Sequence, residues 1–228
     1  MTPSRNLGQH DIHVWYADLS TYGGRCALST HEYARAARLH APLDHERFVA
    51  AHSLWRSILG AYLAVDPETL EFVHANLGKP SVKSPHVPLG FSASHSQHLA
   101  AIALVRDVEL GLDIESTARP LVEAPGVAAI AFSPDERRRL AAVPQDQHTE
   151  VFLTGWTQKE AVAKALGQGL HAELSRIQVS FDACRPFESL PGWQIIPLSP
   201  GRGAVASLAA PHGIHWQVFE GWWSERSC

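Results

Sequence analysis

Hydrophobic and polar positions along the chain predict one order of elements that occurs twice. In the first half, residues 12–19 are rich in β-branched and aromatic side chains and predict an opening strand. Residues 28–39 carry Ser29 three positions before Glu32, which is the order of a capping box, and continue as a helical run. Residues 44–63 repeat apolar side chains at helical spacing, so we expect a long amphipathic helix there.

The pattern then changes to strands before it returns to helices. Residues 88–105 predict two strands separated by a polar break, and residues 108–116 predict another short strand. Residues 132–143 predict a second capped helix, and residues 150–170 predict a second long helix that ends at a pair of glycines. From residue 175 onwards the pattern predicts a meander of strands with Pro and Gly turns.

The two capped helices also match residue by residue at an offset of 104 positions (133 − 29 = 104). The matched positions are Ser29, Glu32 and Arg35 in the first copy and Ser133, Glu136 and Arg139 in the second. We therefore expect an α+β fold made of a pseudo-twofold pair of similar α+β subdomains, with helices against mostly antiparallel sheets. The expected subdomains are residues 1–108 and 109–228, and the cleft between them is the expected place for a ligand.

Composition and charge exclude several classes of function. The net charge is −4, so no basic field would draw the protein to nucleic acid or to a membrane surface. The longest purely apolar run, Leu99–Val105, is far too short to span a bilayer, and the first residues lack the apolar run of a signal peptide. Three scattered cysteines support neither a zinc ribbon nor a disulfide framework, so we expect a cytoplasmic protein.

Two acidic side chains stand on one predicted strand. Asp113 and Glu115, in the segment GLDIE, are two residues apart and therefore point to the same face, while Ile114 points into the core. Neighbouring carboxylates repel each other unless a cation lies between them, and hard oxygen ligands without cysteines favour Mg²⁺. A solvated acidic strand edge is the alternative interpretation.

The second long helix carries further candidates on one face. Trp156, Glu160 and Lys164 lie four residues apart from one to the next, so their side chains are neighbours on the helix surface. An ordinary exposed Glu–Lys pair is the alternative, but a tryptophan on the same charged face favours a bound ligand.

The first half offers a different set, suited to phosphate. Ser94 and His95 lie at the end of a predicted strand, and Lys79 stands next to Pro80 in a predicted tight turn. Hydroxyl, imidazole and ammonium groups can all donate hydrogen bonds to phosphate oxygens. Arginines on or near the first helices either add to this charge or form a solvated helix face; they are Arg35, Arg38 and Arg47. Cations in one half and acids in the other predict phosphoryl or phosphodiester transfer on a pyrophosphate held between the halves.

The order of these motifs resembles the two-domain, Sfp-type 4′-phosphopantetheinyl transferases. The matching motifs are Gly-Lys-Pro at 78–80, Ser-His-Ser at 94–96, Gly-x-Asp-Ile-Glu at 111–115 and Trp-x-x-Lys-Glu-Ala-x-x-Lys-x-x-Gly-x-Gly-Leu at 156–170. The resemblance implies transfer of the 4′-phosphopantetheine group of coenzyme A to a serine of an apo acyl or peptidyl carrier protein. It also implies that adenosine 3′,5′-bisphosphate is released.

The resemblance further implies a role for each matching residue. The implied ligands of Mg²⁺, which Mn²⁺ could replace, are Asp113, Glu115 and Glu160. The implied catalytic residues are Glu160, which takes the proton of the carrier serine, and Lys164, which assists the leaving phosphate. The implied coenzyme A contacts are Arg35, Arg47, Lys79, Pro80, Ser94, His95 and Lys164. Glu136 matches a further recurrent acid.

The chain departs from the family pattern at two positions, and its two halves are not equivalent. Ser92 stands where many members have asparagine, and Glu32 stands at an early basic position. At the offset of 104, Glu160 corresponds to Arg56, so the acids occur in one half only and we expect a monomer with one site. A metal-dependent phosphohydrolase acting on a nucleotide pyrophosphate and a non-catalytic coenzyme A-binding protein are the alternatives.

Overall fold

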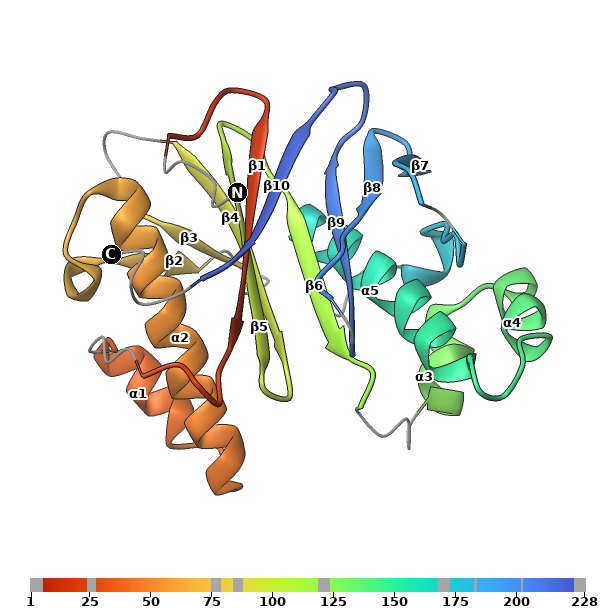
Figure 1. Ribbon diagram of the computed structural model, residues 1–228, viewed down its shortest axis with the longest axis horizontal. Coiled ribbons are helices and arrows are strands. Elements are labelled where there is room, and N and C mark those ends of the chain that lie inside the picture. Colours follow the sequence, from red (N-terminus) through yellow and green to blue (C-terminus); the bar gives the residue numbers. More distant parts are fainter. Residues whose placement is uncertain are drawn as a thin grey trace.

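Two four-stranded sheets lie beside each other, with helices on their outer faces (Figure 1). The computed structural model describes residues 6–23, 28–74, 79–83, 88–118, 124–167, 173–182, 184–201 and 203–223. The elements of the first half are β1 (Asp11–Asp18), α1 (Thr30–Ala36), α2 (Pro42–Leu63), η1 (Pro67–Thr69), β2 (Phe72–His74), β3 (Pro80–Val82), β4 (Leu89–Ser96) and β5 (Leu99–Arg106). Those of the second half are β6 (Gly111–Ser116), α3 (Ala124–Ala131), α4 (Pro134–Ala141), α5 (His148–Leu166), η3 (Leu174–Arg176), β7 (Phe187–Leu190), β8 (Trp193–Pro197), β9 (Ala204–Pro211) and β10 (Gln217–Trp222). The α+β class is confirmed.

Strand order is the same in the central part of both sheets. The first sheet has the order β10-β1-β5-β4 and the second β6-β9-β8-β7, and a short hairpin pairs β2 with β3. β1 and β4 both pair antiparallel with β5, as β6 and β8 do with β9. Each half therefore contributes an opening strand, a short helix, a long helix and a hairpin, in the predicted order.

The last strand departs from the predicted meander. β10 leaves the second half and pairs in parallel with β1, from Asp11 opposite Gln217 to Tyr16 opposite Trp222. Figure 1 shows this strand, in dark blue, crossing to the sheet of the first half. The boundary between residues 108 and 109 falls between β5 and β6, but β10 belongs to the first sheet.

Both predicted capping boxes are present, and they are alike. Ser29 N donates to Glu32 Oε2 at 2.8 Å, and Ser133 N donates to Glu136 Oε2 at the same distance. Both glutamates are buried, at 5% and 6% exposure. A buried carboxylate needs a partner, and each finds a cation on the long helix that follows: Arg56 for Glu32 at 2.7 Å and Lys159 for Glu136 at 2.9 Å.

Apolar side chains fill the space between the two sheets and beneath each long helix. Ile12 and Val14 of β1 pack in one cluster with Leu112 and Ile114 of β6, which joins the two sheets. α2 packs against the other face of the first sheet, and α5 packs against β6 and β9. Within the part of the chain that the structure describes, no helix has both the length and the apolar character needed to cross a membrane.

Three local features of the structure differ from the prediction. Helix α3 and the β2–β3 hairpin were not predicted, and the strand predicted at residues 175–181 is instead the 3-10 helix η3 followed by irregular chain. In residues 175–181, side chains satisfy backbone groups that would otherwise need a neighbouring strand. Lys159 Nζ donates to the carbonyls of Leu174 and Ile177, and Val179 N donates to Glu136.

Gly111, at the start of β6, permits the close approach of α5. A Cβ atom at this position would lie 1.8 Å from the carbonyl oxygen of Ala161 and 2.5 Å from the nitrogen of Ala165. Both of those atoms are helix backbone, which cannot rotate away as the end of a side chain could. The absence of a side chain at Gly111 therefore sets the distance between β6 and α5.

Gly111→Ala is expected to destabilise the fold by about 1–3 kcal/mol, the usual cost of overpacking a core, because α5 must move away from β6. The midpoint of thermal unfolding should fall accordingly. Gly126→Ala is the matched control, because a Cβ on α3 at that position meets nothing within 4 Å. Equal melting temperatures for the two variants would contradict the assignment of close packing to Gly111.

Candidate active site

The two predicted acids of β6 lie at the seam between the halves. Asp113 and Glu115 are 5% and 7% exposed, while Leu112 and Ile114 point the other way into the core between the sheets. The predicted alternation is therefore correct. Asp113 contacts Ser94 of β4 and Lys164 of α5, and Glu115 contacts Ser96 of β4, so both carboxylates lie where these elements pack beside β6.

Alternate serines of β4 stabilise the edge of β6 that is not paired with β9. Ser92 Oγ accepts a hydrogen bond from Leu112 N at 3.0 Å, and Ser96 Oγ accepts one from Ser116 N at 3.2 Å. These hydroxyls replace the backbone carbonyls that a neighbouring strand would offer. Ser92, which departs from the family pattern, thus contributes to the seam.

The serines also hold the acids in place. Ser94 Oγ donates to Asp113 Oδ1 at 2.7 Å, and Ser96 Oγ donates to Glu115 Oε2. Ser94 was predicted to contact a phosphate of the ligand, but its hydroxyl is turned toward Asp113 and Lys164. In this structure Ser94 therefore positions the acid rather than lining the pocket.

Lys164 and Glu160 extend from α5 toward the same seam. Lys164 Nζ donates to Asp113 Oδ1 at 2.7 Å, to Ser94 Oγ at 2.9 Å and to the carbonyl of Leu112 at 3.1 Å. Burial raises the pKa of Glu160, and the charges of Asp113 and Glu115 raise it further, whereas Lys164 opposes the shift. The carboxylate of Glu160 is therefore a stronger base than an ordinary exposed glutamate.

Trp156, the third residue of the predicted helical face, serves a different purpose. It is partly buried against the apolar cluster that contains Phe132 and Phe152. The tryptophan thus packs α5 against the neighbouring helices.

The chemistry of these acids fits a hard divalent cation. Asp113 Oδ2 is buried and has no hydrogen-bond partner, so it is an acceptor that a cation would satisfy. Within the described ranges, no group of three or more His, Cys, Asp or Glu side chains is already arranged so that it could hold a metal ion. The three-carboxylate set of Asp113, Glu115 and Glu160 therefore remains a prediction that requires their side chains to converge.

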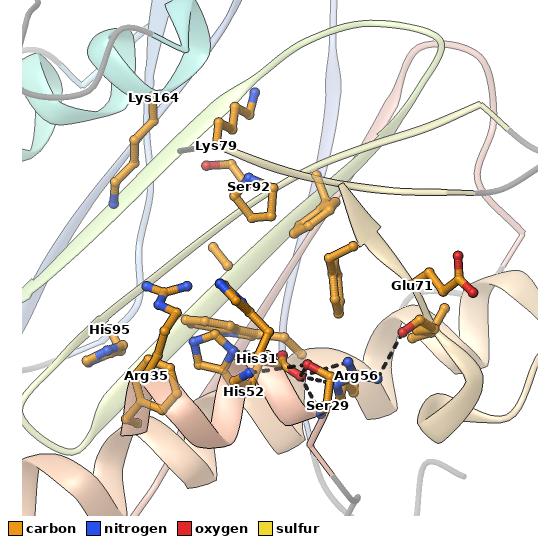
Figure 2. Close-up of a pocket in the computed structure, with 18 of the residues that line it drawn as sticks. Ser29, His31, Arg35, His52, Arg56, Glu71, Lys79, Ser92, His95 and Lys164 are labelled. Atoms are coloured by element: carbon orange, nitrogen blue, oxygen red, sulfur yellow. Dashed lines mark hydrogen bonds and ion pairs between the residues drawn. The ribbon is translucent and has the colours of Figure 1, made fainter. Parts of the chain in front are cut away.

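A pocket of about 820 Å³ opens next to Lys164 and extends over the first half (Figure 2). It is lined by Ser29, His31, Glu32, Arg35, Phe48, His52, Trp55, Arg56, Leu70, Glu71, Phe72, Lys79, Pro80, Phe91, Ser92, Ala93, His95, Lys164 and Gly167. Its size suits a nucleotide-sized ligand. Its walls combine aromatic rings with the cationic side chains of Arg35 on α1, Arg56 on α2, Lys164 on α5 and Lys79 just before β3.

The structure brings most of the predicted phosphate contacts to this pocket. Those that line it are Arg35, Lys79, Pro80, His95 and Lys164. Figure 2 shows Lys164 and Arg35 extending toward the space between them from different elements. Lys79 is held at the rim by Glu109 and by the carbonyl of Leu110 at 2.9 Å.

Arg47 lies outside the pocket lining. Its guanidinium donates to Gln97 Oε1 at 3.0 Å and lies 3.6 Å from Asp44 Oδ1. Arg47 therefore links α2 to the β4–β5 turn.

Two acids that the sequence left without a clear role are structural. Glu136 is buried against Lys159 and accepts a hydrogen bond from Val179 N at 3.2 Å. Glu32, at the early basic position, contacts Arg56 and His52. Arg56, which is 1% exposed, lies 2.7 Å from Glu32 and neutralises its charge in the wall of the pocket.

Sequence reasoning missed the histidines of the pocket, His31 and His52. Neither belongs to a motif, and among 14 histidines in the chain no spacing distinguishes them. The spacing of His52 could have drawn attention to it, because it lies four residues after Phe48 and three before Trp55 and so shares a helix face with two aromatic rings.

Cysteine placement gives little further information. Cys184 is exposed and free. Cys26 and Cys228 lie outside the described residues.

A cationic pocket beside two buried carboxylates is the arrangement of a site for a phosphorylated ligand, and comparison with known proteins agrees with it. A family model described as the 4′-phosphopantetheinyl transferase superfamily matches residues 109–221, the half that carries the acids. The 4′-phosphopantetheinyl transferase HetI of Nostoc sp. (strain PCC 7120) is 33% identical over 224 residues, which cover 94% of this chain and 93% of HetI.

Relatives that match a shorter part of the chain carry the same name. The 4′-phosphopantetheinyl transferase Sfp of Bacillus subtilis (strain 168) is 28% identical over 153 residues, covering 67% of this chain and 66% of Sfp. AcpT of Escherichia coli (strain K12) is 36% identical over 122 residues, covering 54% and 58%. The chain belongs to the 4′-phosphopantetheinyl transferase superfamily, as its motifs predicted, and it is a 4′-phosphopantetheinyl transferase.

Proposed function

We propose that the enzyme transfers the 4′-phosphopantetheine group of coenzyme A to a serine of an apo acyl or peptidyl carrier protein, in a reaction that requires Mg²⁺. The observation that carries this proposal is the position of Lys164. This side chain lines the cationic pocket, while its ammonium group bonds Ser94 on β4 and Asp113 on β6. One residue thus connects a phosphate-binding pocket with a set of carboxylates, as a pyrophosphate between the two would require.

The carboxylates are the proposed metal ligands. Asp113, Glu115 and Glu160 would hold Mg²⁺, for which Mn²⁺ could substitute, and the unsatisfied Asp113 Oδ2 supports this choice. The ion would neutralise charge on the pyrophosphate oxygens. Arg35, Lys79 and His95 would bind the remaining phosphate oxygens from the walls of the pocket, with Pro80 beside Lys79. Arg47 needs to leave Gln97 before it could join them.

The chain's own residues suffice for the proton transfers of the reaction. Glu160 accepts the proton of the carrier serine, because its raised pKa makes it a stronger base than an ordinary glutamate. The serine oxygen forms a bond to the phosphorus that carries the pantetheine arm. The bond from that phosphorus to the bridging oxygen breaks, and its electron pair leaves with adenosine 3′,5′-bisphosphate. Lys164 stabilises the negative charge that develops on the leaving phosphate.

The architecture supports one site in each chain. The first and second halves share element order, strand order and capping boxes, which supports origin by duplication. The same likeness supports the proposed subdomains at 1–108 and 109–228, although β10 of the second range completes the sheet of the first. Only the second half carries the acids, so we propose a monomer that binds one coenzyme A. A cytoplasmic location is part of the same proposal, since carrier proteins and coenzyme A would meet the enzyme there.

Mass spectrometry of apo carrier proteins tests the proposed function. Incubation with the enzyme, coenzyme A and Mg²⁺ should add one phosphopantetheine group to the carrier, and a carrier whose acceptor serine is replaced by alanine should remain unchanged. Excess chelator should stop the transfer, and added Mg²⁺ or Mn²⁺ should restore it. Release of adenosine bisphosphate from coenzyme A without any change in carrier mass would favour a phosphohydrolase instead.

A further inference from the structure

We propose that His52 is a further ligand-binding residue of this site, which takes up a proton when coenzyme A binds and contacts its 3′-phosphate as an imidazolium. This inference rests on the proposed function, because coenzyme A supplies the phosphate monoester. His52 belongs to none of the motifs that the chain shares with its family. The contacts of its ring carry the argument.

Aromatic neighbours hold the ring of His52 in one orientation at the pocket. Its centroid lies 4.0 Å from that of Phe48 in a stacked arrangement and 4.8 Å from that of Trp55. Trp55 in turn lies 6.0 Å from His95, so the row of rings leads from α2 to β4. Figure 2 shows His52 beside Arg35 and His31, with His95 on the same side of the pocket.

Glu32 determines which nitrogen of His52 carries the proton. His52 Nδ1 lies 3.0 Å from Glu32 Oε1. Burial alone would raise the pKa of Glu32, but hydrogen bonds from His52, Arg56 and Ser29 outweigh it and hold that pKa far below its usual range. Since Glu32 is ionised, Nδ1 donates, and in the neutral ring Nε2 carries a lone pair. Among the described residues Nε2 has no hydrogen-bond partner.

A neutral His52 therefore presents an acceptor to an anionic ligand, and this repels phosphate. Protonation converts Nε2 into a donor while Nδ1 keeps its bond to Glu32. The same side chain then offers phosphate a charge-assisted hydrogen bond.

The burial and the charges around His52 keep its ring neutral in the free protein, and a bound anionic ligand favours its protonation. Burial lowers the pKa of His52, Glu32 opposes the shift, and the positive charges of Arg35 and Arg56 reinforce it. His31 on α1 and His95 on β4 face the same pocket. A phosphate dianion in the pocket adds negative charge next to these groups and raises the affinity of His52 for a proton.

Proton uptake on binding makes the affinity for coenzyme A depend on pH, and the direction of this dependence follows from the proposal. The proton is bound in the complex and not in the free protein, so affinity rises as the pH falls from about 8 to 6. A charge-assisted hydrogen bond corresponds to about a tenfold change in affinity or more.

Isothermal titration calorimetry of coenzyme A binding measures this uptake directly, when it is repeated in buffers of different ionisation enthalpy. His52→Asn should lower proton uptake at pH 7 by about half a proton or more. It should also weaken binding about tenfold at pH 6 and much less at pH 8. Titration of the phosphate itself is common to both proteins. The charge of His52 lowers the pKa of His95, so removing His52 favours protonation of His95, and a loss of proton uptake in the variant is therefore assigned to His52.

A second substitution at His52 and a control histidine outside the pocket make the result interpretable. His52→Phe keeps the ring stack without a titrating nitrogen, and it should lose the same proton uptake if His52→Asn proves unstable. His212→Asn is the matched control, because His212 Nδ1 also faces a glutamate, Glu188, at 3.5 Å but lies outside the pocket. It should bind coenzyme A with unchanged uptake.

Dephospho-coenzyme A separates the inference from the proposed function. It lacks the 3′-phosphate, so wild type and His52→Asn should bind it with equal affinity. Unchanged proton uptake in both His52 variants, or equal weakening for the two ligands, would overturn the role of His52 even where transfer to the carrier is intact. Failure of the wild-type enzyme to bind coenzyme A at all would overturn both.

Discussion

Replacement of Asp113 by alanine is expected to lower the rate of phosphopantetheine transfer by about two to three orders of magnitude, the range that loss of one preorganised electrostatic contact costs. Asp113 accepts hydrogen bonds from Ser94 and Lys164 through Oδ1, and its buried Oδ2 is left for a cation. The variant removes the proposed metal ligand and also releases Lys164 from its position beside the pocket. The rate is measured from the mass of the carrier protein with time.

Two further variants make the result interpretable. Asp113→Asn keeps the shape and an acceptor oxygen for Lys164 but removes the charge, so its rate should fall nearly as far with less effect on stability. Asp135→Ala is the control, because Asp135 is exposed on α4 in a pair with Arg138. A folded Asp113 variant that transfers within about threefold of the wild-type rate would show that this carboxylate is not part of the machinery.

Glu32→Gln is expected to destabilise the protein by about 3–5 kcal/mol, because it leaves the buried guanidinium of Arg56 without its charged partner. In a chain of this size that corresponds to a fall of about 10 °C in the melting temperature. Arg56 is 1% exposed and donates from Nε to Glu32 at 2.9 Å. The double variant Glu32→Gln/Arg56→Met removes the uncompensated charge and should recover part of the loss.

The loss of stability in Glu32→Gln should become smaller as the pH falls. The pKa of Glu32 is depressed in the folded protein by its partners, so its contribution to stability is present above its ordinary pKa and is lost as the pH falls below it. The difference between wild type and Glu32→Gln should therefore shrink on acidification from about pH 6 to pH 3. Glu173→Gln, in an exposed pair with Arg176, should cost about 1 kcal/mol or less at any pH. A Glu32 variant that melts like this control would contradict the structural role of the buried pair.

Local patterns were sufficient to predict the elements that bury one face and begin with a cap. Ser29 and Ser133 each precede a glutamate by three residues, and both form capping boxes, because the bonds involved join residues within one turn. β6 was predicted with the correct faces, since alternation in a strand requires no knowledge of its neighbours: the acids bond β4, and Leu112 and Ile114 enter the core. The family followed from motifs for the same reason: residues at short spacing on one element keep their relation in any fold.

Contacts between distant segments could not be predicted in this way. The parallel pairing of β10 with β1 joins residues about 200 positions apart, and nothing in either strand specifies the other. Residues 175–181 carry a strand-like pattern, yet Lys159 and Glu136 satisfy their backbone groups from two helices. The tertiary environment overrides local propensity there.

The sequence by itself determined which side chains are available for chemistry: acids on β6 and α5, cations in the first half. The tertiary structure decided what each of them touches. It turned Ser94 from the pocket toward Asp113, and it buried Glu32 against Arg56. It also placed His52 in the wall of the pocket. The physical reason is that hydrogen bonds and ion pairs act over a few ångströms, so their partners are set by how the helices and sheets pack and not by separation along the chain.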